Sequence, residues 1–300
     1  MAIAPRGRFA PTPSGDLHLG SLVAAVGSYL HVRSQGGTWL LRIDDLDAPR
    51  VVPGASDRIQ HCLEAFGLHW DETVYFQQPQ QEHYQAALEQ LVATGRVYRC
   101  QCSRKQLSQS ADSISVDGSL RYPGFCRDRQ LSSDVEGSDR LNVQGLAAIA
   151  LEDAWQGSYQ QHLAQAVGDF ILRRRDRLFS YHLATVVDDA RQGITEVIRG
   201  LDLLASTPRQ IALQQLLNLP TPHYGHLPLV VWPNGDKLSK QTKAPALDLR
   251  QAPALLSQAI AHLGLKLPSE LQSAPVREQL DWAIAHFPAP RLSKQPDLRS

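Results

Sequence analysis

Two short segments, far apart in the chain, carry side chains that suit the binding of a polyphosphate. The first is RFAPTPSGDLHLG at residues 8–20, and the second is KLSKQ at residues 237–241. In the first segment an apolar strand is expected to end near Ala10, and helical spacing of apolar residues begins at Leu19. His18 and Gly20 therefore lie at a predicted strand-to-helix junction, where free backbone N–H groups and the helix dipole favour phosphate.

The second segment follows an apolar run at residues 227–232 and a predicted turn at residues 233–236. Lys237 and Lys240 are thus expected on a polar loop, where ammonium groups can neutralise charge that builds up during phosphoryl transfer. Taken singly, each segment has an ordinary alternative. The first could be a strand–turn–helix with an incidental histidine, and the second a solvated basic loop.

The elements that must position these residues alternate between strand-like and helix-like patterns. A strand is expected at residues 38–43, and helices are expected at residues 55–66 and 81–94. This alternation predicts an α/β fold with a parallel sheet covered by helices. Residues 169–173 are expected to return the chain to that sheet after a more polar region, and two amphipathic helices are expected near the C-terminus.

Three of the four cysteines are grouped, at Cys100, Cys102 and Cys126. Two thiolates one residue apart and a third on a predicted turn could fill three positions of a tetrahedral zinc site. The alternative is three reduced surface thiols. Cys62 lies among helically spaced apolar residues and is expected in the core.

Composition excludes some functional classes. The 30 lysines and arginines balance 30 aspartates and glutamates, so any nucleic-acid surface must be local, for example around Arg121, Arg127, Arg129 and residues 173–177. No apolar run approaches the roughly 20 residues of a membrane span, and the first residues do not resemble a secretion signal. We expect a cytoplasmic monomer that makes no membrane contact.

Taken in order, the motifs resemble those of class I aminoacyl-tRNA synthetases. Residues 8–20 and 237–241 resemble the HIGH and KMSKS signatures of that class. Four further segments resemble its glutamate-activating branch: LRIDDLD at 41–47, YHLA at 181–184, VVDD at 186–189 and GITEVIRG at 193–200. The resemblance implies a ligase, and it extends from about residue 7 to about residue 245.

The resemblance also implies a domain organisation. A Rossmann-like parallel sheet would be built from two halves, residues 1–96 and 168–245. A zinc-bearing insertion, residues 97–167, would separate them; in the family this region contacts the acceptor end of tRNA. Residues 246–300 would form a short helical C-terminal region, without the anticodon-binding domain of synthetases that charge a whole tRNA.

The Cys-x-Cys … Tyr-x-x-x-Cys pattern resembles the zinc site of the glutamyl-Q tRNA(Asp) synthetases. That similarity implies Tyr122 as the fourth ligand beside Cys100, Cys102 and Cys126.

The resemblance further implies the substrate site. ATP, with Mg²⁺, would be bound by His18, Gly20 and Lys240, and the catalytic residues would be His18, Lys237 and Lys240. The residues that would bind glutamate are Arg8, Phe9, Ala10, Pro11, Thr12, Asp44, Tyr181 and Arg199. The arginines would bind a carboxylate through their planar guanidinium groups. Asp44, where the family more often has Glu, would take the ammonium directly or through water.

The reaction implied is ATP-dependent activation of L-glutamate as glutamyl-adenylate, without tRNA, followed by transfer. In glutamyl-Q synthetases the acceptor is the cyclopentenediol of queuosine in the anticodon loop of tRNA(Asp), a single-stranded loop of the kind that proteins recognise by shape and stacking. Alternatives are a minimal glutamyl-tRNA synthetase that charges a tRNA 3′ end, a small-molecule nucleotidyltransferase of the same superfamily, and a non-catalytic RNA-binding paralogue.

Overall fold

The centre of the protein is a parallel β-sheet. The computed structural model describes residues 4–110, 114–116, 118, 120–231, 244–288 and 297–299. Within these residues, the central sheet has five strands in the order β10-β9-β1-β2-β3, and every neighbouring pair is parallel. The strands are β1 (Arg6–Phe9), β2 (Thr38–Ile43), β3 (Tyr75–Phe76), β9 (Glu196–Gly200) and β10 (His223–Leu227). The predicted α/β class and the predicted strand at residues 38–43 are confirmed.

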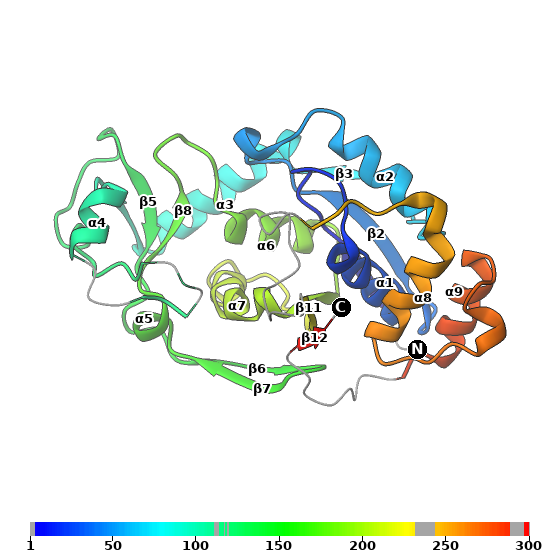
Figure 1. Cartoon of the computed structure of the whole chain (residues 1–300). Helices are drawn as coiled ribbons and strands as arrows, with labels where there is room; N and C mark the ends of the chain where they lie inside the picture. Colours follow the sequence, from blue (N-terminus) through cyan, green and yellow to red (C-terminus); the bar gives the residue numbers. More distant parts are fainter. Residues whose placement is uncertain are drawn as a thin grey trace.

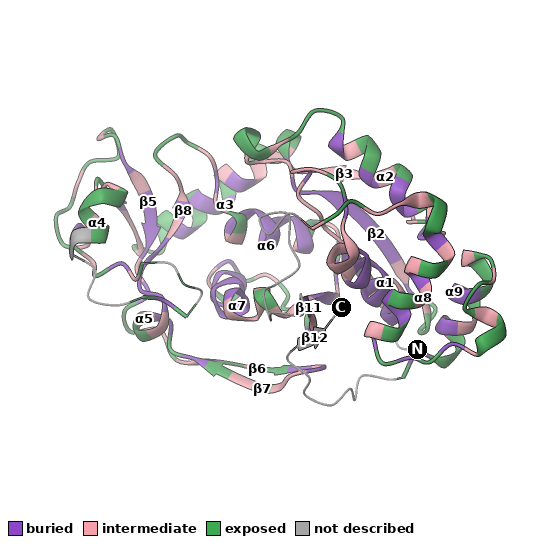
Figure 2. Cartoon of the chain, in the orientation of Figure 1, coloured by how far each residue is buried: buried purple, intermediate pink, exposed green. Residues whose placement is uncertain are grey.

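Helices cover both faces of the sheet. Each strand contributes to both of the resulting cores, because successive residues of a strand point to opposite sides. Trp39 and Leu41 enter one core, and Leu40, between them, enters the other. The first core is completed by α1 (Leu19–Arg33), α2 (Ala55–Ala65), α8 (Ala252–His262) and α9 (Val276–His286). The second is completed by α3 (Gln81–Ala93), α6 (Tyr181–Arg191) and α7 (Thr207–Leu216). Figure 2 shows the buried residues lining these helix faces and β2.

The insertion forms a lobe beside the sheet (Figure 1). Its three-stranded antiparallel sheet has the order β4-β5-β8, with β4 at Val97–Cys100, β5 at Ser138–Leu141 and β8 at Phe170–Arg173. The predicted return of residues 169–173 to the parallel sheet is therefore wrong. A four-residue apolar strand carries no local signal for the sheet it joins, and β8 satisfies its backbone on β5. The lobe's helices are α4 (Arg104–Ser110) and α5 (Leu163–Ala166).

A β-hairpin connects the lobe to the central sheet. Strands β6 (Ile149–Asp153) and β7 (Gly157–Gln161) run from α5 toward β10 (Figure 1). At its turn, the backbone N–H of Ala154 donates to the carbonyl oxygen of Tyr224 at 2.9 Å. Trp155 packs against Gly225, where a Cβ atom would lie 2.1 Å from the indole ring, so only glycine allows this approach. The hairpin turn is thus fitted to the middle of β10.

The remaining elements surround the sheet. Helices α8 and α9 bear the two apolar stripes predicted for the C-terminal region, and Gly264 ends the first with a φ of +83°. Strand β11 (Leu229–Val231) pairs with β12 (Asp297–Arg299). The 3₁₀ turns are η1 (Ala48–Arg50), η2 (Gln78–Gln80), η3 (Leu201–Ser206), η4 (Leu249–Gln251) and η5 (Ser269–Leu271). Across the described residues, no helix combines the length and apolarity needed to cross a bilayer.

Candidate active site

The N-terminus of α1 opens into a cavity. His18 is the N-cap residue of this helix, and its Nδ1 accepts a hydrogen bond from the backbone N–H of Ser21 at 3.3 Å. A cavity of about 580 Å³ adjoins this turn; its lining includes Phe9, Ala10, Pro11, Thr12, His18, Gly20, Leu229 and Val230. A helix N-terminus beside a cavity of this size suits a nucleotide. The predicted positions of His18 and Gly20 at a strand-to-helix junction are confirmed.

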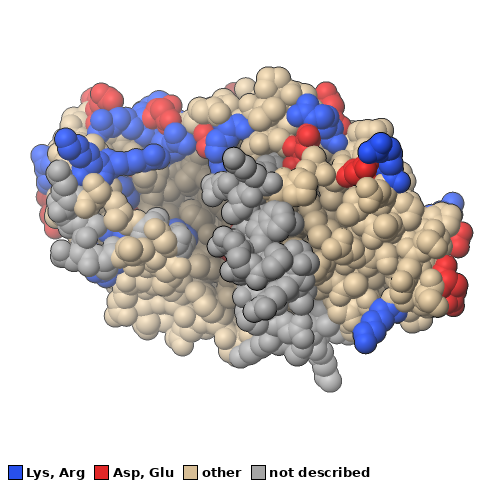
Figure 3. Space-filling model, in the orientation of Figure 1, with Lys and Arg blue, Asp and Glu red and all other residues tan. Residues whose placement is uncertain are grey.

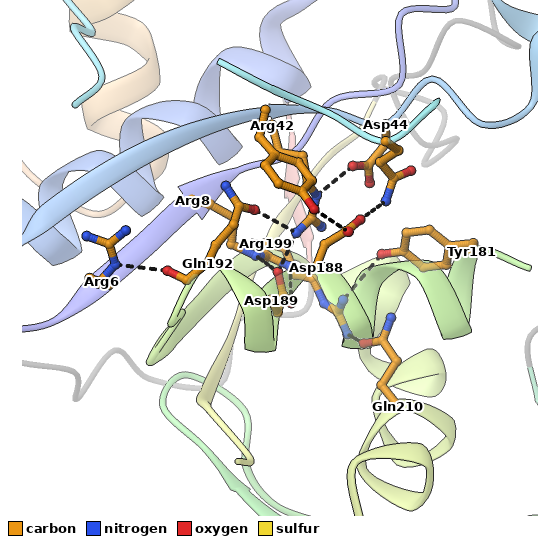
Figure 4. Close-up of polar contacts among 12 residues, drawn as sticks. Arg6, Arg8, Arg42, Asp44, Tyr181, Asp188, Asp189, Gln192, Arg199 and Gln210 are labelled. Atoms are coloured by element: carbon orange, nitrogen blue, oxygen red, sulfur yellow. Dashed lines mark hydrogen bonds and ion pairs between the residues drawn. The ribbon is translucent and has the colours of Figure 1, made fainter. Parts of the chain in front are cut away.

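Three arginines project from neighbouring strands onto the α6 face of the sheet (Figure 4). Arg8 stands opposite Leu40 in the β1–β2 register, and Arg42 lies two residues further along β2, so both share the face of Leu40. Arg199 lies on β9, where Val197 two residues earlier packs in the same core. The relative exposure of these arginines is 4%, 0% and 6%. Buried cations require compensating partners.

Helix α6 supplies one carboxylate, Asp189, that two of these arginines share. Asp189 accepts from Arg8 Nε at 2.9 Å and Nη2 at 3.1 Å, and from Arg42 Nη1 at 2.6 Å. Burial alone would raise the pKa of Asp189, but the two guanidinium groups hold it below its usual range. The preceding Asp188 accepts from the side chains of Tyr75, Gln77 and Tyr84. The two acids of the VVDD segment therefore clamp the sheet to α6, a role that the motif resemblance did not assign to them.

Arg199 has a different environment from Arg8 and Arg42. Its hydrogen-bond partners in the described structure are all neutral: Tyr181 Oη at 3.3 Å, Thr207 Oγ1 at 2.8 Å, Gln210 Oε1 at 2.7 Å and His226 Nε2 at 3.1 Å. Because none of these is an acid, the buried positive charge of Arg199 has no carboxylate hydrogen-bonded to it. Arg199 is the better placed of the predicted arginines to attract a carboxylate, since Asp189 already neutralises Arg8.

Asp44 stands where two cavities meet. Its Oδ1 accepts from Arg42 Nε at 2.8 Å. Burial raises the pKa of Asp44 to about 6, against the opposing influence of Arg42. Together with Thr12, Arg50 and Tyr181, Asp44 lines both the cavity at α1 and a second cavity of about 870 Å³. A molecule in either cavity therefore approaches the same group of side chains.

The second cavity lies against the insertion lobe. Its lobe-side lining includes Arg104, Lys105, Arg140 and Phe170. Exposed lysine and arginine side chains gather on this lobe (Figure 3), including Arg104, Lys105, Arg129 and Arg175. The cavity is partly lined by apolar side chains and adjoins a basic surface. Such a site suits a single-stranded nucleic acid, with a base in the cavity and the phosphate backbone along the basic side chains.

The predicted metal ligands are brought together in the lobe. The Sγ atoms of Cys100, Cys102 and Cys126 all lie within 4.8 Å of one another. The Sγ atoms of Cys102 and Cys126 are 3.6 Å apart, and the hydroxyl of Tyr122 lies 3.3 Å from Cys100 Sγ and 3.6 Å from Cys102 Sγ. Zn–S bonds of about 2.3 Å and a Zn–O bond of about 2.0 Å at tetrahedral angles require S···S near 3.8 Å and S···O near 3.5 Å. The donor set therefore fits a zinc ion.

Without a metal, the ligand groups differ in protonation: burial raises the pKa of Cys102 to about 11 and that of Tyr122 well above its usual value, so a bound metal would have to displace their protons. Burial opposes ionisation of Cys126, but hydrogen bonds from the Gln101 backbone and the Tyr122 hydroxyl lower its pKa to about 7. The guanidinium of Arg140 lies 3.9 Å from the centroid of the Tyr122 ring, a cation close to the place where a phenolate would form. A bound zinc ion would join β4 to the turn that carries Cys126, so we assign it a structural role.

Replacing Cys126 with serine is expected to lower the zinc content per chain several-fold, because a hydroxyl seldom replaces thiolate in such a site. Metal analysis of the purified variant measures this directly. Cys62→Ser is the control, since Cys62 lies on the core-facing side of α2 and burial raises its pKa to about 12. Full zinc occupancy in the Cys126 variant would remove this residue from the ligand set.

The family follows from comparison with known proteins. Residues 6–252 match the model of the catalytic domain of class I tRNA synthetases (E and Q). A glutamyl-Q tRNA(Asp) synthetase of Synechococcus sp. is 93% identical over 297 residues, which cover 99% of both chains. The chain belongs to the glutamyl-Q tRNA(Asp) synthetase family.

Other relatives agree with this assignment. A glutamyl-Q tRNA(Asp) synthetase of Pseudomonas aeruginosa is 49% identical over 288 residues, which cover 96% of this chain and 95% of the relative. The solved structure of a glutamate-tRNA synthetase from Elizabethkingia anophelis matches with a TM-score of 0.82 at 25% identity, over 99% of this chain and 68% of that one. The class I synthetase fold is therefore confirmed for this member of the glutamyl-Q tRNA(Asp) synthetase family.

The site of this family member contains residues that the motifs did not reveal. Lys237 and Lys240 lie outside the described residues, so the structure adds nothing to their predicted role. Asp189 and Gln210 contact the predicted arginines, and His226 and Asp153 form a buried pair behind Arg199. The adjacent acids of VVDD were a visible signal, because carboxylates within a buried helix need partners. His226 and Asp153 offered no such signal.

Proposed function

We propose that this chain activates L-glutamate with ATP as glutamyl-adenylate, without tRNA, and transfers the glutamyl group to the cyclopentenediol of queuosine in the anticodon loop of tRNA(Asp). The observation that carries the proposal is the meeting of two cavities at Asp44 and Tyr181, in front of the buried charge of Arg199. One cavity adjoins the N-terminus of α1, and the other adjoins the basic lobe. The full-length similarity to proteins named for this activity supports the choice of acceptor.

In the first step, an oxygen of the glutamate α-carboxylate attacks the α-phosphorus of ATP, and the bond to the bridging oxygen breaks to release pyrophosphate. Positioning and charge stabilisation supply most of the catalysis in such transfers. We assign phosphate binding to His18, Gly20 and the N-terminus of α1. Lys240, with Lys237, is proposed to stabilise charge on the leaving pyrophosphate, and Mg²⁺ accompanies the ATP.

Glutamate is proposed to lie at the junction of the two cavities. Its side-chain carboxylate would bind Arg199 and the Tyr181 hydroxyl, which already contact each other. Its ammonium would face Asp44, with Thr12 and the chain at residues 9–11 completing the site. Arg8 stays a predicted carboxylate ligand, although its ion pair with Asp189 gives it a smaller share than Arg199.

In the second step, a hydroxyl of the acceptor attacks the carbonyl carbon of the adenylate, and AMP leaves. The acceptor would enter through the cavity beside the basic lobe. We propose that residues 97–167 act as an insertion between catalytic halves 1–96 and 168–245, with residues 246–300 as a helical C-terminal region. The sheet of this insertion also contains β8, residues 170–173, which lie just after its proposed end. A monomer acting in the cytoplasm, where tRNA is found, completes the proposal.

The KM for glutamate is expected to rise as the pH falls below about 6, because the pKa of Asp44 is about 6 and the group loses its charge below that value. Above that pH the ionised carboxylate attracts the ammonium, so the KM should be low and constant. Asp44→Asn should give a high glutamate KM with little pH dependence. ATP–pyrophosphate exchange from about pH 5 to pH 8 tests this, with the KM for ATP as the internal control. A flat glutamate KM in the wild-type enzyme would contradict the assignment of Asp44.

The proposed function is tested by transfer of labelled glutamate to tRNA(Asp) with and without queuosine, beside tRNA(Glu). Label on queuosine-containing tRNA(Asp) alone is expected. Label on tRNA(Glu) would show a minimal glutamyl-tRNA synthetase that charges a 3′ end. Adenylate formation with no transfer to any of these would overturn the proposed acceptor, and absence of glutamate-dependent exchange would overturn activation itself.

A further inference from the structure

Behind Arg199 lies a buried histidine–aspartate pair. His226 is the register partner of Arg199 on the adjacent parallel strand, so the two side chains share the α6 face of the sheet. Arg199 Nε donates to His226 Nε2 at 3.1 Å. The side chains of His226 and Asp153 are both completely buried, and His226 Nδ1 lies 2.5 Å from Asp153 Oδ2. The pair does not line the proposed glutamate site itself but contacts Arg199, which does.

The hydrogen bonds fix the protonation of the imidazole ring. A guanidinium can only donate, so His226 Nε2 must be the acceptor in its contact with Arg199. The hydroxyl of Thr207, 3.1 Å from the same Nε2, can donate to it as well. The proton of a neutral ring therefore stands on Nδ1 and is donated to Asp153. Burial lowers the pKa of His226 to about 4, against the hydrogen bond to Asp153, so the neutral form prevails at neutral pH.

Asp153 is itself held rigidly. Its Oδ1 accepts three backbone hydrogen bonds, from the N–H groups of Trp155, Gln156 and His226. The Gln156 side chain also donates to the carbonyl oxygen of His226 at 2.7 Å. The His226 N–H belongs to β10, and the other donors belong to the turn of the β6–β7 hairpin, which reaches β10 from the insertion lobe. The hairpin turn thus sets the orientation of the His226 ring.

The chemical type of this support matters as much as its rigidity. An acid placed directly on Arg199 would neutralise it, as Asp189 neutralises Arg8. A neutral imidazole accepts the hydrogen bond of Arg199 Nε without cancelling the positive charge of the guanidinium. The His226 ring also separates Arg199 from the carboxylate of Asp153. A buried arginine held in this way favours an anionic carboxylate over a neutral amide of the same shape.

We propose that His226, oriented by Asp153, is a positioning residue that holds Arg199 ready for the side-chain carboxylate of glutamate and contributes to rejection of glutamine. The inference rests on the proposed function, because it takes Arg199 as the glutamate-binding arginine. It adds that the hairpin turn of the insertion, through His226, takes part in amino-acid selection.

The test is steady-state ATP–pyrophosphate exchange by His226→Leu, which removes the acceptor and keeps an apolar side chain of moderate size. We expect the KM for glutamate to rise about 10- to 100-fold, the usual effect of leaving a buried donor unsatisfied, while the KM for ATP changes less than about twofold. The ratio of glutamate to glutamine activation should fall. His226→Gln, which can again accept from Arg199, should recover part of the loss.

The matched control is His223→Leu on the same strand. His223 is exposed and pairs with Glu196, on the opposite side from Arg199, so its replacement should leave both KM values unchanged. A wild-type glutamate KM in His226→Leu would overturn the proposal. Absence of exchange in the wild-type enzyme would instead overturn the proposed function and this inference with it, a result that the variants cannot imitate.

A second measurement reads the protonation of the His226 ring instead of the activity of the enzyme. Nitrogen-15 NMR of the wild-type enzyme at neutral pH should show a histidine with a proton on Nδ1 and none on Nε2 whose signal is missing from His226→Gln. The Nδ1 atoms of His223 and His286 also face acceptor oxygens, so similar signals from those two rings should remain in the variant. A doubly protonated ring, or a proton on Nε2, would overturn the proposal. Asp153→Asn should weaken glutamate binding in the same direction as His226→Leu, and an unchanged glutamate KM would contradict the orienting role of Asp153.

Discussion

Replacing Arg199 with alanine is expected to lower kcat/KM for glutamate in ATP–pyrophosphate exchange by roughly 30- to 1000-fold, equivalent to about 2–4 kcal/mol for losing one side of a buried charge pair. The loss should appear mainly in the KM for glutamate. Arg199 is buried, its recorded partners are neutral, and its guanidinium contacts the Tyr181 hydroxyl, so the substitution removes a positive charge directly at the proposed carboxylate site. The KM for ATP should change little, because the proposed ATP site adjoins the N-terminus of α1.

Two variants sharpen this measurement. Arg199→Lys keeps the charge but loses the planar fork that contacts Thr207 and Gln210, so an intermediate loss is expected. Arg277→Ala removes an arginine that is 90% exposed on α9 and should match the wild-type enzyme. If Arg199→Ala retained the wild-type KM for glutamate, the carboxylate would have to bind elsewhere, and Arg8 would be the remaining predicted cation.

Replacing Asp189 with asparagine is expected to lower the free energy of unfolding by about 3–5 kcal/mol, the usual effect of breaking a buried ion pair. Asp189 is the carboxylate shared by Arg8 and Arg42, so the substitution leaves two buried guanidinium groups short of a negative charge. This is a large part of the roughly 5–15 kcal/mol that stabilises a typical domain. Urea unfolding followed by circular dichroism would measure it.

The pH dependence of the same difference provides a second check. The pKa of Asp189 is lowered in the folded protein, so its stabilising contribution is fully present above the ordinary carboxyl pKa. It should be lost only as the pH falls below that value, toward the lowered pKa, where wild type and Asp189→Asn should converge. Glu72→Gln is the control, because the exposed Arg6–Glu72 pair should contribute no more than about 1 kcal/mol. An equal effect of the two substitutions would contradict the clamp role of Asp189.

Local sequence was sufficient for the features that depend on neighbours in the chain. The start of α1 at Leu19, with His18 as its N-cap, follows from two local patterns. Proline and glycine residues end the preceding strand, and apolar residues with helical spacing begin at Leu19. The apolar stripes of α8 and α9 follow from the same periodicity. The spacing of Cys100, Cys102 and Cys126 was enough to suggest three ligands of a metal site, whereas Tyr122 as the fourth ligand came only from the family resemblance.

Tertiary structure decided which of the two predicted glutamate-binding arginines has an acidic partner. Arg8 and Arg199 both occur in matching motifs, and nothing adjacent to either one in sequence distinguishes them. The difference lies in Asp189, 181 residues after Arg8, and in His226, which the parallel register places beside Arg199. Such partners are fixed by burial: a charge that leaves water must find a partner wherever the packed chain provides one. Sequence alone therefore predicted the class and the candidate site residues, whereas the packing of α6 and the β6–β7 hairpin against the sheet determined that Arg8 has an acidic partner and Arg199 has neutral ones.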